Sequence, residues 1–372
     1  MLKSGQSVLT WLTIVDALGG EPMWRDEFGR NYLSGHVEPD LLRGSLGWAV
    51  IDKISQTSTL EPLMHRISVQ PPAYPGSYIE TRVDGGDIIH RTWRYGAVIK
   101  YLHAGATLVT NRADRLHTGP ARLREEFEYF ADDPAWANCY ACWTKESAFG
   151  RHHDGHSTVI IQAEGSKHWR VWRGNGPEAE LVEDRQMVEG DVWHIPQDWD
   201  HEATGTGPSL HWTFGTHRTT ASELVATVLN AHSNRQPQGS QKSVHDIISE
   251  VSSDVPRARL IRSAQSLERR GGLSFPWSVG GGEYKGTRLR WAARFRPVLE
   301  SLGADIEVQS LGMRLRVDGG LLPWIKEWSE GRTVLFDEAV DLSLSNDEVV
   351  SALDTLVGAG LVLIEDATTG NL

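Results

Sequence analysis

The chain has 372 residues, which is enough for two or three domains and for a core that needs no disulfide or metal staples. Its 37 Lys and Arg residues against 49 Asp and Glu residues give a net charge of -12, which disfavours binding of nucleic acid by the chain as a whole. Two cysteines cannot form a disulfide framework, and no apolar stretch reaches the ~18 residues of a membrane span. We therefore expect a cytoplasmic protein without direct DNA binding and without membrane insertion.

The N-terminal segment, residues 1–20, has an apolar run that Asp16 interrupts and lacks the cleavage site of a secretory signal, so an amphipathic helix is expected there. From residue 86 to 218, short apolar or alternating runs separated by Gly, Pro and Asp turns predict a β-sandwich or barrel. The predicted strands are 97–102, 107–110, 158–163, 168–172, 191–195 and 210–215.

Beyond residue 218, apolar residues recur at steps of three and four, which indicates helices. The predicted helices are 221–231, 243–251 and 257–269. This change of pattern divides the chain into three expected domains. They are residues 1–218 with an N-terminal α/β extension, a helical region at 219–300, and an α+β domain at 301–372.

The C-terminal domain has the element order of a winged helix. Its predicted helices are 321–328, 334–340 and 346–357, and a strand at 361–364 follows them. Ser345 and Glu348 form a capping box at the start of the third helix. That helix carries Asp347, Glu348 and Asp354 and no basic residue, so it would repel DNA phosphate. A structural or partner-docking module is the preferred interpretation.

A basic segment, residues 257–296, carries ten Lys or Arg residues against Glu268 and Glu283. Two interpretations stay open. The charges lie on solvated helix faces, or they form a surface that gathers an acidic peptide or an RNA–protein particle.

The richest cluster of potential ligands is the run from Phe149 to His156. Side chains alternate faces in an extended chain, so His152 and Asp154 project to one side and can share a metal ion. A Pro-started loop after a short strand presents His201 as the third ligand. Two histidines and one carboxylate leave three adjacent coordination positions open, which suits Fe(II) oxygenases and not a closed structural zinc site.

Lys167 lies fifteen residues beyond His152, on the expected returning strand of a hairpin. A dicarboxylate cosubstrate that chelates iron through its keto-acid end needs a fixed cation for its far carboxylate. The ammonium group of Lys167 is suited to this role.

The runs His152 to Asp154, Gln162 to Val171 and Gly190 to His201 resemble JmjC-type cupin oxygenases, and within these the ribosomal oxygenases. The resemblance covers about residues 97–218. It implies a mainly β catalytic domain, the double-stranded β-helix of the cupin or jelly-roll type. It also implies that the helical linker domain at 219–300 mediates dimerisation and that a winged-helix domain follows at the C-terminus. It also implies Fe(II), 2-oxoglutarate as cosubstrate, and O2.

Transferred by position, the resemblance assigns iron binding to His152, Asp154 and His201. It assigns contacts with 2-oxoglutarate to Lys167, Tyr140, Thr213 and Asn138. The loop at 145–151 departs from the family's Pro- or Gly-rich pattern, which indicates a different substrate-facing rim.

Two further motifs have alternative interpretations. His156 has the parity of His152 and is the rival metal ligand. The pair Cys139 and Cys142 lies in an expected strand, where the thiols face opposite sides, so packing is preferred to redox or zinc chemistry.

The sequence thus predicts a 2-oxoglutarate-dependent hydroxylase that acts on a side chain of a protein or peptide and forms a homodimer. A ribosomal protein is the default target by resemblance, and a biosynthetic peptide bound by the basic segment is the next. Two alternatives remain: a non-catalytic cupin sensor with a regulatory winged helix, and a JmjC-type demethylase.

Overall fold

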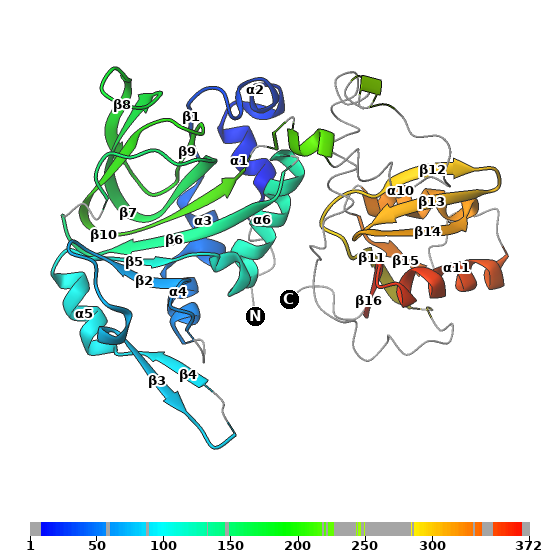
Figure 1. Cartoon of the computed structure of the whole chain (residues 1–372), viewed down its shortest axis with the longest axis horizontal. Coiled ribbons are helices and arrows are strands. Elements are labelled where there is room, and N and C mark those ends of the chain that lie inside the picture. Colours follow the sequence, from blue (N-terminus) through cyan, green and yellow to red (C-terminus); the bar gives the residue numbers. More distant parts are fainter. Residues whose placement is uncertain are drawn as a thin grey trace. The chain divides into compact units, whose positions relative to one another are not determined.

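The computed structural model describes residues 9–56, 60–86, 89–131, 133–145 and 149–217 of the N-terminal part. Of the C-terminal part it describes residues 219–220, 222–226, 243, 245–246, 249, 284, 286–329, 332–336 and 345–366. The chain divides into two compact units, unit 1 at residues 1–218 and unit 2 at residues 219–372 (Figure 1). Among the described helices, none has the length and apolarity required to cross a membrane.

Unit 1 is built on an eight-stranded antiparallel sheet of order β1-β9-β7-β10-β6-β5-β2, with β8 paired to β7. Its strands are β1 (Leu33–His36), β2 (His65–Ser68), β5 (Thr107–Thr110), β6 (Ala135–Cys142), β7 (Ser157–Arg173), β8 (Glu180–Met187), β9 (Asp191–Ile195) and β10 (His201–Thr216). A separate two-stranded sheet pairs β3 (Ile79–Val83) with β4 (Ile89–Trp93).

Helices cover one side of this sheet (Figure 1). They are α1 (Trp11–Ala17), α2 (Gly20–Glu27), α3 (Pro39–Leu46), α4 (Trp48–Ser55) and α6 (Thr118–Ala131), with the short 3-10 turn η2 (Ala113–Arg115). Helix α5 (Tyr95–His103) and the 3-10 turn η1 (Pro75–Ser77) lie near β3 and β4, and the buried residues of α5 belong to a separate cluster with Tyr78 and Trp93. Helix α1 confirms the helix expected near the N-terminus. Helix α5 shows that the prediction of a strand at 97–102 is wrong, because one face of this segment is buried at helical spacing, through Val98 and Leu102.

Successive side chains of β10 point alternately to the core and to the opposite face of the sheet. Trp212 and Phe214 lie in the core, where the indole of Trp11 stacks on Phe127 at 4.3 Å between ring centroids. The intervening residue Thr213 lines a cavity on the other face. Successive side chains of a strand point to opposite faces, so this single strand supplies both the core and the cavity wall.

The predicted hairpin around Lys167 is wrong, because β7 is one continuous strand of 17 residues. Gly165 interrupts its pleat with a positive φ of 62°, and a Cβ at this position would lie 2.1 Å from the carbonyl oxygen of Pro208. Residues 158 and 160 line the cavity before Gly165, whereas 167 and 169 line it afterwards. The reversal lies just before Gly165, at a register shift against β10 in which Gln162 pairs with His211 and Glu164 with Leu210. This irregularity turns Lys167 towards the cavity.

Unit 2 contains two three-stranded antiparallel sheets, β15-β11-β16 and β12-β13-β14. Its elements are β11 (Thr287–Trp291), β12 (Val298–Leu302), β13 (Asp305–Ser310), β14 (Met313–Asp318), η3 (Gly319–Leu321), α10 (Leu322–Ser329), β15 (Val334–Leu335), α11 (Asn346–Gly358) and β16 (Val362–Asp366). Their core includes Trp291, Trp324, Trp328 and Leu353.

Several predictions for the C-terminal part can be compared with these elements. Helices α10 and α11 and strand β16 are confirmed, as is the capping box of Ser345 and Glu348. The predicted helix at 334–340 is wrong at its start, because Val334 and Leu335 pair with β11 as a strand. Strands β11 and β12 lie at the end of the region that we expected to be helical.

Most of the predicted linker lies outside the described residues. Residues 222–226 are helical, but the rest of the predicted helix at 221–231 and all of the helix at 257–269 are not described. The same holds for the part of the basic segment before residue 284. The winged helix stays a prediction.

Candidate active site

A cavity of about 280 Å³ opens in unit 1 on the sheet face opposite the helices, lined mainly by β6, β7 and β10. Its lining residues are Arg66, Thr107, Tyr140, Cys142, Phe149, His152, Asp154, Thr158, Ile160, Lys167, Trp169, His201, Ala203, Gly205, His211 and Thr213. A concave site with an apolar wall and a few convergent polar groups is the usual form of a small-molecule site.

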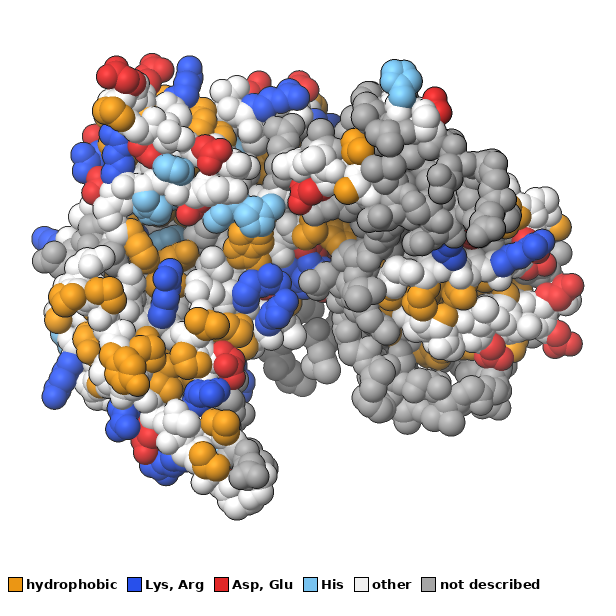
Figure 2. Space-filling model, in the orientation of Figure 1, with side chains coloured by type: hydrophobic (Ala, Val, Ile, Leu, Met, Phe, Trp, Pro, Cys, Tyr) orange, Lys and Arg blue, Asp and Glu red, His pale blue; other side chains and the backbone are white. Residues whose placement is uncertain are grey.

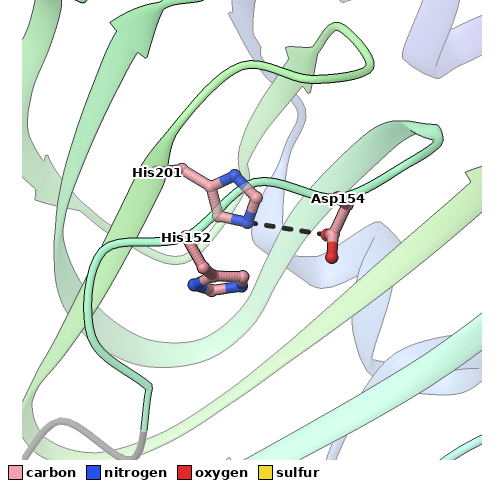
Figure 3. A group of neighbouring side chains, drawn as sticks. All are labelled: His152, Asp154 and His201. Atoms are coloured by element: carbon pink, nitrogen blue, oxygen red, sulfur yellow. Dashed lines mark ion pairs between the residues drawn. The ribbon is translucent and has the colours of Figure 1, made fainter. Parts of the chain in front are cut away.

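One end of the cavity brings together the three predicted metal ligands. The ligand atoms of His152, Asp154 and His201 all lie within 4.8 Å of one another. Nε2 of His201 lies 3.6 Å from Oδ2 of Asp154, and Figure 3 shows the three side chains converging from two segments. Two backbone hydrogen bonds join those segments, from His152 N–H to His201 O at 3.0 Å and from His201 N–H to His152 O at 2.7 Å.

Both imidazoles are held in the form that a metal ion requires. Nδ1–H of His152 donates to Gly150 O at 2.8 Å, and Nδ1–H of His201 donates to Trp199 O at 3.2 Å. Each bond leaves Nε2 as the free lone pair, as backbone carbonyls do for metal-bound histidines. Burial, and then the neighbouring His152, lower the pKa of His201, so this ring is neutral. The donor set therefore fits a ferrous ion in a 2-His-1-carboxylate site.

The other end of the cavity contains the buried ammonium group of Lys167, whose residue is 4% exposed. Its Nζ donates to Nδ1 of His211 at 3.0 Å. Burial lowers the pKa of Lys167. In the described part of the chain no carboxylate forms an ion pair with it, so a carboxylate ligand in the cavity would satisfy a cation that is otherwise costly to bury.

Tyr140 and His211 form one wall as a cross-strand pair of β6 and β10. Their rings are stacked at 4.8 Å between centroids with an interplanar angle of 3°. Burial, and then the charge of Asp154, raise the pKa of Tyr140 to about 12, so its hydroxyl stays protonated and can donate to a carboxylate. Thr213 also lines the cavity.

Asn138 occupies a different place from the other predicted contacts, because it does not contribute to the cavity lining. Its Oδ1 accepts a hydrogen bond from the backbone N–H of Arg112 at 3.0 Å. This bond ties β6 to the turn before α6. On β6, Asn138 pairs with the cavity residue Thr213 and hydrogen-bonds the side chain of Tyr140, so it supports the cavity wall.

The rival ligand His156 approaches Asp154 but does not join the three-residue cluster. Its Nε2 lies 3.9 Å from Oδ2 of Asp154, and its ring packs against Trp136 at 4.9 Å between centroids. The two cysteines are free and buried: Cys139 lies in the core, and Cys142 lines the cavity with its thiol 3.1 Å from Oγ of Ser209.

Sequence reasoning missed the role of His211. His211 shares the parity of Thr213 on β10, and this signal could have found it. Arg66, Thr107 and Trp169 were missed because they come from three other segments, and no local spacing connects them to the metal motif.

Residues 112–224 match the family model described as JmjC domain. This part of the chain is thus similar to a JmjC domain. Among curated proteins, the ribosomal protein uL16 3-hydroxylase of Escherichia coli (strain K12) is 22% identical over 199 residues, which are 48% of this chain and 53% of that protein. The bifunctional lysine-specific demethylase and histidyl-hydroxylase NO66 of Caenorhabditis briggsae is 30% identical over 116 residues, 26% of this chain and 14% of that protein. The aligned part thus spans about half of the first relative.

Solved structures resemble this chain over nearly its full length. The X-ray structure of E. coli ycfD has a TM-score of 0.57 at 14% identity and covers 97% of this chain and 99% of that one. The structure of YcfD, a ribosomal oxygenase from Escherichia coli, in complex with cobalt and 2-oxoglutarate has a TM-score of 0.55 at 14% identity and covers 92% and 97%. This likeness confirms the predicted cupin-type, sheet-rich fold.

Proposed function

We propose that this protein is an Fe(II)- and 2-oxoglutarate-dependent oxygenase that hydroxylates a side chain of a protein or peptide. The observation that carries the proposal is a single cavity with a 2-His-1-carboxylate cluster at one end and a buried, carboxylate-free ammonium group at the other. A keto-diacid between them would satisfy both ends.

In this proposal His152, Asp154 and His201 hold the ferrous ion, and their Nδ1–H bonds keep both imidazoles oriented. When bound, the ferrous ion activates O2 with oxidation of 2-oxoglutarate to succinate and CO2. The role of the chain is to position the reactants, because the oxidised C–H bond needs no acid or base from the protein.

Three side chains of the cavity receive the far carboxylate of 2-oxoglutarate in this proposal. Lys167 supplies the charge, Tyr140 donates its hydroxyl proton and Thr213 offers a further hydroxyl. His211 accepts a hydrogen bond from Lys167 at 3.0 Å and fixes the direction of the ammonium group. The apolar walls formed by Ile160 and other cavity residues exclude water around the cosubstrate.

The target that we propose is a protein or peptide side chain, because one curated relative is named for hydroxylation of a ribosomal protein and another for histidyl hydroxylation. A ribosomal protein is our first candidate and a biosynthetic peptide our second. We also propose a homodimer, a C-terminal winged helix without direct DNA binding, and a cytoplasmic location, for which the two free thiols are the structural support.

Two measurements test the proposed function. Anaerobic addition of Fe(II) and 2-oxoglutarate to the full chain should give a weak visible charge-transfer band, and its absence from folded protein would contradict the site. Mass spectrometry of peptides from cells with and without the protein should then find a gain of one oxygen atom. Loss of a methyl group would indicate the demethylase, and the band without any turnover would indicate the sensor.

A further inference from the structure

A buried carboxylate lies directly behind the metal cluster. Asp200 precedes His201, and its side chain is 7% exposed. Asp200 is not part of the cavity lining, whereas His201 is. Arg151 and His153 are also outside the cavity lining, whereas His152 between them is part of it. Alternation along the two extended segments thus places three side chains on the outer side of the metal-binding residues.

The outer side chains form one hydrogen-bonded group. Nε of Arg151 donates to Oδ2 of Asp200 at 2.8 Å, and Nδ1 of His153 lies 3.2 Å from Oδ1. The backbone N–H of Gly176 donates to Oδ2 at 3.1 Å. The guanidinium of Arg151 also donates to Gly176 O at 2.7 Å and lies 4.2 Å from the ring centroid of Trp172. Charge-assisted bonds to a buried carboxylate are among the stronger contacts in a protein.

This group connects the two segments that carry the metal ligands. His152 and Asp154 belong to the first segment and His201 to the second, and the pairing of His152 with His201 is an isolated bridge outside the named strands. One further backbone hydrogen bond, from Asp198 N–H to Asp154 O at 2.9 Å, joins the same two segments. The carboxylate of Asp200 adds contacts with the two residues that flank His152 in the chain, Arg151 and His153.

We propose that Asp200 is a positioning residue for the metal centre: its carboxylate holds the segment of His152 and Asp154 against the segment of His201, so that the three ligands are preorganised. This inference rests on the proposed function, because it assumes that the three residues bind a metal ion. Partners behind metal ligands change metal affinity by roughly 10- to 100-fold when they are lost.

The test measures Co(II) affinity of the full chain by calorimetry or visible absorption. Asp200→Asn should weaken Co(II) binding ~10- to 100-fold, because an amide cannot accept all three hydrogen bonds and carries no charge. The matched control is Glu202→Gln. Glu202 follows His201 directly and forms an ion pair with Arg170 at 2.5 Å. Glu202→Gln therefore also removes a charge from an ion pair beside a metal ligand. We expect it to leave the affinity unchanged.

A second variant covers the case in which Asp200→Asn does not fold. Arg151→Gln changes a side chain that is 34% exposed, and we expect it to weaken Co(II) binding and to reduce the rise in Tm that Co(II) produces. If Arg151 has a merely structural role, Arg151→Gln lowers the Tm equally with and without Co(II), and this result would overturn the inference. An unchanged Co(II) affinity in folded Asp200→Asn would overturn it as well. If the wild-type chain binds no Co(II), the metal centre and the proposed function fail as well.

Discussion

The two ends of the cavity are built in different ways. At the metal end, His152 and Asp154 lie on an irregular segment before β7, and Asp154 is 34% exposed at its side chain. At the cosubstrate end, Lys167 lies inside a long strand and is buried against His211 of a neighbouring strand. The first end depends on hydrogen bonds between two short segments, and the second on the register of the sheet.

This difference decides what each end tolerates. A change at the metal end alters the ligands themselves but disturbs little packing around them. A change at the cosubstrate end leaves a buried polar group without its partner, which costs about 1 to 3 kcal/mol. Binding experiments should therefore separate the two ends, because a substitution at one end should change the affinity for one ligand only.

The largest effect should come from Asp154→Ala, which removes the only carboxylate of the three-residue cluster. Two imidazoles cannot neutralise a divalent ion, so we expect Co(II) affinity to fall by more than ~100-fold. Titration of Co(II) with detection by visible absorption measures this change. Asp184→Asn on β8 provides the control, and a variant of Asp154 with undiminished Co(II) affinity would show that the cluster is not the metal site.

Lys167→Ala should act on the opposite end. It removes the cation proposed for the far carboxylate, so the Kd of 2-oxoglutarate for the Co(II)-loaded chain should rise ~100-fold, the size of a lost buried charge pair. Co(II) affinity should change less than twofold. Calorimetry with each ligand in turn measures both values, and an equal loss of Co(II) and 2-oxoglutarate binding would break the separation of the two ends.

A smaller effect is expected for His211→Leu, which removes the acceptor of the Lys167 hydrogen bond. The Kd of 2-oxoglutarate should rise ~10-fold, because the buried ammonium group loses one partner. His211→Asn keeps a side-chain acceptor and should recover part of the affinity. Weakened Co(II) binding with normal 2-oxoglutarate binding would place His211 at the metal end instead.

The smallest effect concerns folding and not binding. His194 on β9 is buried, its Nδ1–H donates to Thr158 O at 3.0 Å, and its Nε2 accepts from the N–H of Gly29 at 2.9 Å. Burial lowers its pKa to about 4, below the unfolded value of about 6.5. The unfolded chain therefore binds more protons as the pH falls, and unit 1 should lose about 1 kcal/mol of stability between pH 7 and 5.5.

Hydrogen exchange of the β9 amides in urea, followed across this pH range, measures the loss of stability. His194→Asn should flatten the pH dependence at the cost of lower stability at pH 7. A pH dependence that is identical in the variant would show that another group is responsible.

The metal end could be predicted from sequence because its chemistry is local. His152 and Asp154 are two residues apart, and the turn before His201 is marked by Gly, Asp and Pro. The cosubstrate end could be predicted only in part. Lys167 was found by its distance from His152, but a hairpin was expected where one strand continues through a register shift just before Gly165. A β-bulge beside a glycine with positive φ leaves no pattern that distinguishes it from a turn.

Residues supplied by distant strands were the hardest to find. His211 faces Lys167 only because β10 pairs with β7 across an irregular register, which no spacing in the sequence specifies. The hydrogen-bonded group around Asp200 was missed for the same reason, since its partners Arg151, His153 and Gly176 lie on two other segments of the chain. The segment at 97–102 was expected as a strand because a short apolar run has no clear period.

The central claim is that one cavity binds a metal ion and a keto-diacid at opposite ends. Calorimetric titration of 2-oxoglutarate into the full chain, with and without Co(II), tests it most directly. We expect one equivalent of 2-oxoglutarate to bind tightly to the Co(II)-loaded chain. Binding should be weaker in the absence of Co(II) and in Lys167→Ala. Binding that is indifferent to both Co(II) and Lys167, or no binding to the Co(II)-loaded chain, would contradict the account.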